Sequence, residues 1–75
     1  MKIRFQYGDR VAVVPGSAVD AAVKAGREEL LVLLLLADAA EESPDAIAAR
    51  AGLDAEKVRN AIAFWRGTGV IALTD

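Results

Sequence analysis

The chain has 75 residues, with nine lysines and arginines against eleven aspartates and glutamates, and a formal net charge of −2. It contains no cysteine and no histidine, which excludes disulfides, thiolate and imidazole metal ligands and the commonest general base. Its 55% hydrophobic content includes sixteen alanines and only four aromatic residues, which predicts one small non-enzymatic domain with a thin core.

The N-terminal residues have the pattern of a β-hairpin. Residues 2–7 alternate charged or polar side chains with apolar ones at period two, which predicts a strand with one apolar face. That face consists of Ile3, Phe5 and Tyr7. Gly8-Asp9 supplies the turn, and residues 11–14 form a second, β-branched run. We therefore predict a hairpin over residues 2–14.

Two helices are predicted next. Ser17, three residues before Asp20, resembles a capping box and predicts a short helix that ends near Lys24. The following helix begins near Arg27, has two glutamates in its first turn, and runs to about Ala40.

Two further helices and a strand complete the predicted fold. Ser43 caps a helix whose first residue is Pro44 and which ends at Gly52. Asp54 caps the last helix, which continues to Arg66. The apolar residues 70–73 then predict a final strand.

The third and fourth helices have the spacing of a helix-turn-helix. Ala48 is small enough for two helices to approach, Gly52 tolerates a positive φ in the turn, and Val58 returns the second helix to the first. With the N-terminal hairpin pairing with the C-terminal strand, this predicts an α+β winged helix-turn-helix. The expected order is β-β-α-α-α-α-β in a single domain, residues 1–75.

The fourth helix has one apolar face and one polar face. The apolar face recurs at helical spacing and is assigned to the core, with Trp65 as its anchor: Val58, Ala61, Ile62 and Trp65. A DNA-binding alternative is a dimeric winged-helix protein of the transcription-regulator type. The residues that could contact DNA are Lys57, Arg59, Asn60 and Arg66 in the groove, with Lys2, Arg4 and Arg10 on phosphates.

Charge and local structure argue against DNA binding. Residues 1–27 sum to +3, residues 28–56 to −7 and residues 57–75 to +2, so the first helix of the motif lies in an acidic block. Asp54 and Glu56 stand at the end that a recognition helix normally inserts. On the structural alternative, all these charges are solvated faces.

The second helix is apolar nearly all round. One stripe contains Leu30, Leu33, Leu36, Ala37 and Ala40, and the other side contains Leu31, Leu34 and Leu35. Either the chain itself encloses this helix or a partner subunit covers its second side. Phe64 favours a partner, because it projects about 100° from Trp65. The predicted interface is Leu31, Leu34, Leu35 and Phe64, assisted by the N-terminal hairpin.

Other polar residues give no sign of chemistry. Glu28-Glu29 and Glu41-Glu42 are adjacent carboxylates that diverge by about 100° on a helix and offer no convergent metal ligands. Ser17 and Ser43 stand where helix caps are required. No basic-then-apolar leader is present, and the longest apolar run, residues 30–37, is far below the ~18 residues of a membrane span. We expect a cytoplasmic protein without cofactor, metal, membrane or small-molecule substrate.

Three segments resemble the N-terminal domain of DnaD-like bacterial replication-initiation proteins. They are Val13-Val14-Pro15, Glu29-Leu30-Leu31-Val32-Leu33-Leu34, and Val58-x-x-Ala61-Ile62-x-Phe64-Trp65-Arg66-x-x-Gly69-Val70-Ile71. The resemblance spans nearly all 75 residues, and the most distinctive part is Phe64-Trp65 followed by Gly69-Val70-Ile71.

This resemblance implies a winged-helix domain that self-associates as a scaffold in primosome assembly. In that family a separate C-terminal domain accounts for much of the DNA binding, so the resemblance implies either the N-terminal domain of a longer protein or a short paralogue that lacks this second domain. The resemblance implies other replication proteins as partners, with weak DNA binding at most by this domain alone.

Overall fold

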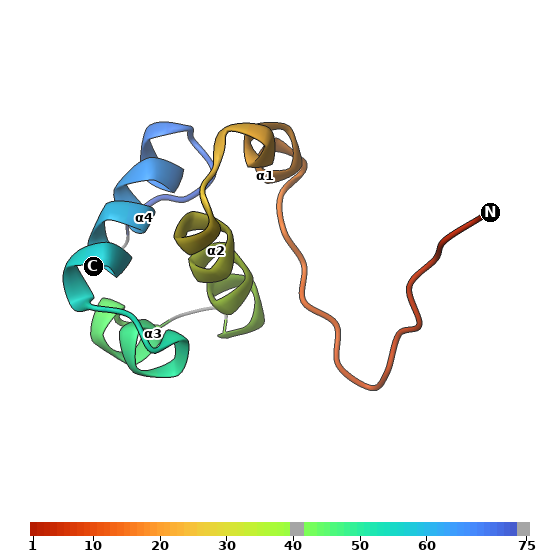
Figure 1. Ribbon diagram of the computed structural model, residues 1–75, viewed down its shortest axis with the longest axis horizontal. Helices are drawn as coiled ribbons and strands as arrows, with labels where there is room; N and C mark the ends of the chain where they lie inside the picture. The colour runs from red at the N-terminus through yellow and green to blue at the C-terminus, as the bar shows by residue number, and fades with distance from the viewer. Residues whose placement is uncertain (40–41, 74–75) are drawn as a thin grey trace.

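The computed structural model describes residues 1–39 and 42–73, and it contains four α-helices within these ranges (Figure 1). They are α1 (Gly16–Ala21), followed by the 3₁₀ turn η1 (Ala22–Lys24), then α2 (Arg27–Ala39), α3 (Pro44–Ala51) and α4 (Ala55–Gly67). The four helices predicted from the sequence are confirmed. The ends of α3 and α4 lie within one residue of those expected, and the first predicted helix corresponds to α1 and η1 together. The predicted end of the second helix at Ala40 and the predicted carboxylate Glu41 lie outside the described residues.

The predicted winged helix is wrong, because the described residues contain no strand. The expected hairpin is instead an extended segment, residues 1–14, which we call the N-terminal arm (Figure 1). The arm bends at Asp9, as the turn signal indicated, but its two legs do not pair. No backbone hydrogen bond joins the arm to any other described residue. Period-two alternation creates a strand only where a second strand accepts its hydrogen bonds, and this fold provides none.

The predicted C-terminal strand, residues 70–73, is the second part of this correction. Val70 N–H donates to Trp65 O at 2.9 Å and Ile71 N–H to the same oxygen at 3.4 Å. These bonds fold the segment back over the end of α4, and both side chains pack beside Trp65. Since the segment completes the helix end, it is unavailable as a sheet partner for the arm.

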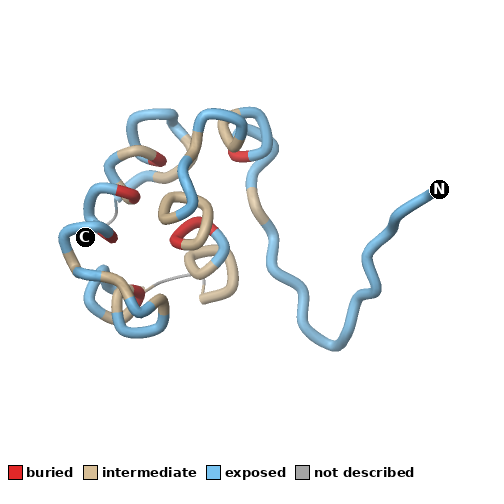
Figure 2. Tube along the Cα trace, viewed as in Figure 1, coloured by how far each residue is buried: buried red, intermediate tan, exposed pale blue. Residues whose placement is uncertain are grey.

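The main core lies among α2, α3 and α4 (Figure 2). It contains four fully buried side chains, one from α2, one from α3 and two from α4. These are Val32, Ile47, Val58 and Ala61. Gly52 makes the α3–α4 turn at φ 67°, a left-handed conformation that glycine adopts without strain. The predicted helix-turn-helix packing of Ala48, Gly52 and Val58 is thus present without a wing.

A second cluster attaches α1 to the bundle. It joins Ala18 of α1, Leu33 of α2 and the fully buried Trp65 of α4. The Trp65 indole Nε1–H donates to Glu29 O at 2.6 Å, which satisfies its polar atom and links α4 to the first turn of α2. Trp65 is the core anchor that the sequence predicted.

Local bonds set the helix ends. Ser43 Oγ accepts from Ala46 N–H at 3.2 Å, which confirms the predicted cap of α3. Ser17 was predicted wrongly, because α1 starts at Gly16 after Pro15, whose carbonyl accepts from Ala18 N–H at 3.0 Å.

The first turn of α2 has a cap that the sequence reading missed. Glu29 Oε1 accepts from Gly26 N–H at 2.8 Å, the reverse half of a capping box. Asp54 precedes α4 as predicted, although its side chain makes no capping bond.

Candidate interaction surface

The described residues contain no buried polar side chain, no metal-binding cluster and no membrane-spanning helix. Every fully buried side chain in residues 1–39 and 42–73 is apolar. The same residues contain no group of three or more acidic side chains placed to hold a metal ion. Nor does any helix there have the length and hydropathy to cross a bilayer.

The four predicted interface residues do not share one surface. Leu34 is 59% exposed and Leu31 is half-buried. Leu35, by contrast, packs against the main core. Phe64 packs against the second cluster and contacts Trp65 edge-to-face, with ring centroids 4.9 Å apart. Only Leu34 of this set lies open to solvent.

The orientation of α2 explains this division. Val32 points into the main core while the next residue, Leu33, points into the second cluster. Because neighbouring residues diverge by about 100° on a helix, packing against both clusters buries a wide arc of α2. Leu34 lies beyond that arc. Val32 lies between the two stripes predicted from the sequence, and for this reason it was assigned to neither.

The N-terminal arm forms a larger exposed apolar surface. Figure 2 shows the arm exposed along nearly all of its length. Its large apolar side chains are between 58% and 110% exposed: Met1, Ile3, Phe5, Tyr7, Val11 and Val13. The rings of Phe5 and Tyr7 lie with their centroids 6.1 Å apart, as expected for residues on the same side of an extended leg.

One carboxylate holds the arm near the helical body. Arg10 Nε lies 3.0 Å from Asp38 Oδ1, and Arg50 Nη2 lies 3.1 Å from Asp38 Oδ2. Arg10 is 80% exposed, so this pair contributes only about 0–1 kcal/mol. The ion pair joins the second leg of the arm to α2. Beside it, arm residues and Leu34 line an open pocket of about 360 Å³, which we call the bay.

The overall dimensions reflect the same geometry. The radius of gyration is 12.9 Å, against about 11.3 Å for a compact chain of this length. The longest dimension is 40 Å and the other two are 26 and 23 Å. The first leg of the arm extends away from the helices and accounts for the elongation (Figure 1).

A larger groove of about 1010 Å³ lies between α2, α4 and the C-terminal segment. Its floor is mainly apolar, from side chains such as Leu36, Ile62 and Ile71, and Arg59 and Arg66 stand along it.

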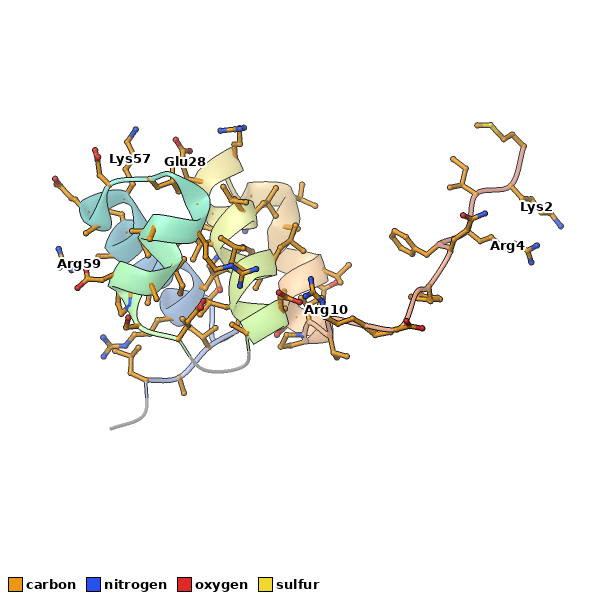
Figure 3. All side chains as sticks on the ribbon, turned by 90° about the horizontal axis from the view of Figure 1, so that it is seen from below. Lys2, Arg4, Arg10, Glu28, Lys57 and Arg59 are labelled. Carbon is orange, nitrogen blue, oxygen red and sulfur yellow. The ribbon has the colours of Figure 1, made fainter. Side chains whose placement is uncertain are left out.

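The predicted DNA contacts are spread over the molecule. Lys57, Arg59, Asn60 and Arg66 are all exposed on α4. Lys2 and Arg4 lie at the outer end of the arm, at the other end of the long axis from Lys57 and Arg59 (Figure 3). Arg10 is paired with Asp38. The fold therefore does not gather these cations into one basic surface.

Comparisons with protein-family profiles, with curated proteins and with solved structures find no match to this chain. Membership of the DnaD-like family stays a prediction from the quoted residues. The winged-helix fold that the resemblance implied does not occur in the described residues.

Proposed function

We propose that this chain is a non-catalytic scaffold module that self-associates through its N-terminal arm and the adjoining Leu34. The observation that carries the proposal is the exposed apolar face of the arm. Ile3, Phe5 and Tyr7 are 84%, 83% and 73% exposed, although together they form one side of an extended leg. Contiguous apolar surface of this kind on a small domain marks a protein-interaction site.

The cellular role follows from the resemblance to DnaD-like proteins. We propose that the module works in the cytoplasm, in DNA replication initiation, as a homo-oligomer that also contacts other primosome proteins. The elongated shape suits such a role, because the arm projects away from the helical body and leaves the groove beside α4 accessible. No cofactor or small-molecule substrate is part of this proposal.

Light scattering coupled to size-exclusion chromatography tests self-association. We expect a mass above the 7.9 kDa of one chain that falls on dilution. Leu34→Glu should weaken association at least about tenfold, equivalent to ~1.4 kcal/mol, because it places a charge beside the arm. Val23→Glu is the matched control, since Val23 is 90% exposed on η1 and does not line the bay between the arm and Leu34. A wild-type chain of monomer mass at all concentrations contradicts the proposal.

DNA binding is the second candidate, favoured by the four exposed polar residues of α4 that follow the α3–α4 turn. Asp54 and Glu56, both exposed, place negative charge at the leading end of that helix. Under the scaffold proposal, a labelled duplex shows no saturable anisotropy change even at low salt. Under the alternative, affinity falls with salt, and Arg59→Ala reduces the logarithmic slope by about 0.9, the value for one phosphate contact.

A further inference from the structure

We infer that the arms of two copies pair with each other as an antiparallel two-stranded ribbon, with Phe5 of one copy opposite Phe5 of the other. This inference rests on the proposed self-association and identifies its geometry. The partner of the arm's unpaired backbone is thus a second copy of this chain, whose apolar side chains lie beside those of the first.

The first argument is the state of the arm backbone. Residues 1–14 are extended, and no backbone hydrogen bond connects them to the rest of the described chain. Their N–H and C=O groups are left to water in a single copy, as on an unprotected edge strand. A second extended arm supplies partners for these groups, and two identical arms pair antiparallel about a two-fold axis.

The second argument is the pattern of apolar side chains. Ile3, Phe5 and Tyr7 point to one side of the leg, while Lys2, Arg4 and Gln6 alternate with them. A register in which odd-numbered residues oppose even-numbered ones would place each apolar side chain opposite a polar one. When the two-fold axis passes through a residue, that residue lies opposite its own copy and odd-numbered residues oppose odd-numbered ones. Only such registers keep the apolar sides together.

The third argument is charge, which distinguishes the three registers centred on Arg4, Phe5 and Gln6. Centring on Arg4 puts two arginines directly opposite each other, and like charges in that position destabilise a sheet. Centring on Gln6 places Lys2 opposite Arg10. It also places Ile3 opposite Asp9.

Centring on Phe5 avoids both conflicts. It places Ile3 opposite Tyr7 and Phe5 opposite its symmetry mate on the apolar side. Arg4 then lies opposite Gln6 on the polar side, and Lys2 lies opposite Gly8. No like-charged pair lies directly opposite, so of the three registers only this one makes the first leg complementary to itself.

The fourth argument is surface area. Phe5 of each copy meets Phe5 of the other, and each Tyr7 meets Ile3 of the other copy, so these rings lose only the part of their roughly 150–250 Å² that faces the neighbouring strand. The rest of a standard interface of roughly 1600 Å² must come from the helical body. The 6.1 Å spacing of the two rings in one copy means that they already present one surface. A two-stranded ribbon is marginal alone, and the apolar bay beside Leu34 extends the contact.

Disulfide trapping tests the register, because the natural chain has no cysteine. Arg4→Cys and Gln6→Cys place thiols on the polar side and leave the apolar face intact. When the two variants are mixed and oxidised, one of them carrying a C-terminal size tag, we expect mixed disulfide dimers. Positions 4 and 6 face each other across the ribbon, whereas two copies of position 4 are diagonal neighbours about 7–8 Å apart. That separation exceeds the reach of an unstrained disulfide, so the mixed product should form about tenfold faster than either homodimer.

Three results overturn the inference and are distinguishable from one another. Faster linkage of Arg4→Cys to itself, or of Gln6→Cys to itself, shows one of the other registers. Equal or absent linkage in a sample that light scattering shows to be dimeric shows association without arm pairing. A sample that is monomeric by light scattering contradicts the proposed function itself. Far-UV circular dichroism of each variant checks that the helices are unchanged.

Discussion

Replacing Trp65 with alanine is expected to lower the free energy of unfolding by about 3–5 kcal/mol, the cost of deleting a large buried aromatic side chain. Trp65 is fully buried, anchors the second cluster and donates a 2.6 Å hydrogen bond to Glu29 O. For 75 residues the total stability is roughly 4–11 kcal/mol. The variant should therefore lose at least about a quarter of its stability, and it unfolds outright if the parent lies at the lower end of this range.

Urea titration followed by far-UV circular dichroism measures this effect. Trp65→Phe is the graded control, because it keeps a ring in the cluster while removing the indole N–H, and we expect a smaller loss of about 1–2 kcal/mol. Ala63→Ser, at an exposed position of the same helix, should stay within about 0.5 kcal/mol of the parent. Equal stability of Trp65→Ala and Ala63→Ser would show that Trp65 does not hold α1, α2 and α4 together.

Replacing Val32 with aspartate is expected to abolish the cooperative fold. Val32 is 0% exposed and packs with Ile47 and Val58, and no cationic side chain belongs to the main core. An ionised carboxylate there would be buried without a partner, which costs several kcal/mol, comparable with the whole stability of the domain. The side chains are similar in size, so the charge and not a cavity causes the loss.

Leu34→Asp is the matched control for this substitution, two residues along the same helix but 59% exposed. It should keep its helical spectrum and unfold within about 1 kcal/mol of the parent, while its mass by light scattering moves toward that of one chain. Thermal unfolding of the two variants side by side separates the roles of α2. A Val32→Asp protein that melted cooperatively at the parent's temperature would contradict the assigned core.

The two faces of α2 thus have different tasks. Val32 and Leu33 hold the bundle together, and Leu34 is left at the surface beside the arm. Asp38, one turn further along, receives Arg10 from the arm and Arg50 from α3. This shared carboxylate is the point at which the second leg of the arm contacts α2 through an ion pair, while the apolar side chains of the first leg are exposed.

Helix positions and most of the core could be predicted from local residue patterns. Ser43-Pro44 and Gly52 act within a few residues, through a side-chain cap and a left-handed turn, so their meaning does not depend on the rest of the fold. The recurrence of Val58, Ala61 and Trp65 on one face of α4 likewise identified buried residues correctly. The Ser17 cap was predicted wrongly because the rigid Pro15 takes the cap position, two residues earlier.

The interface was harder to predict, because exposure depends on which neighbours cover each residue. The three leucines of the predicted interface lie on one helix but differ in exposure. Leu34 is exposed to solvent, Leu31 is half-buried and Leu35 packs against the main core. Phe64 and Trp65 were expected to diverge, but Trp65 belongs to the second cluster and Phe64 packs against it, with the two rings in a T-shaped contact. The cations expected on DNA were likewise separated along the length of the molecule.

The amino-acid sequence by itself determined the four helices, the turn at Gly52 and the anchoring role of Trp65, because capping, glycine conformation and helical periodicity act over a few residues. Only the tertiary structure decided that the two β-like segments remain unpaired. A strand requires hydrogen bonds from a distant partner, and here residues 70–71 already donate to Trp65 O at the end of α4. The arm is consequently left extended, with its apolar face exposed to solvent.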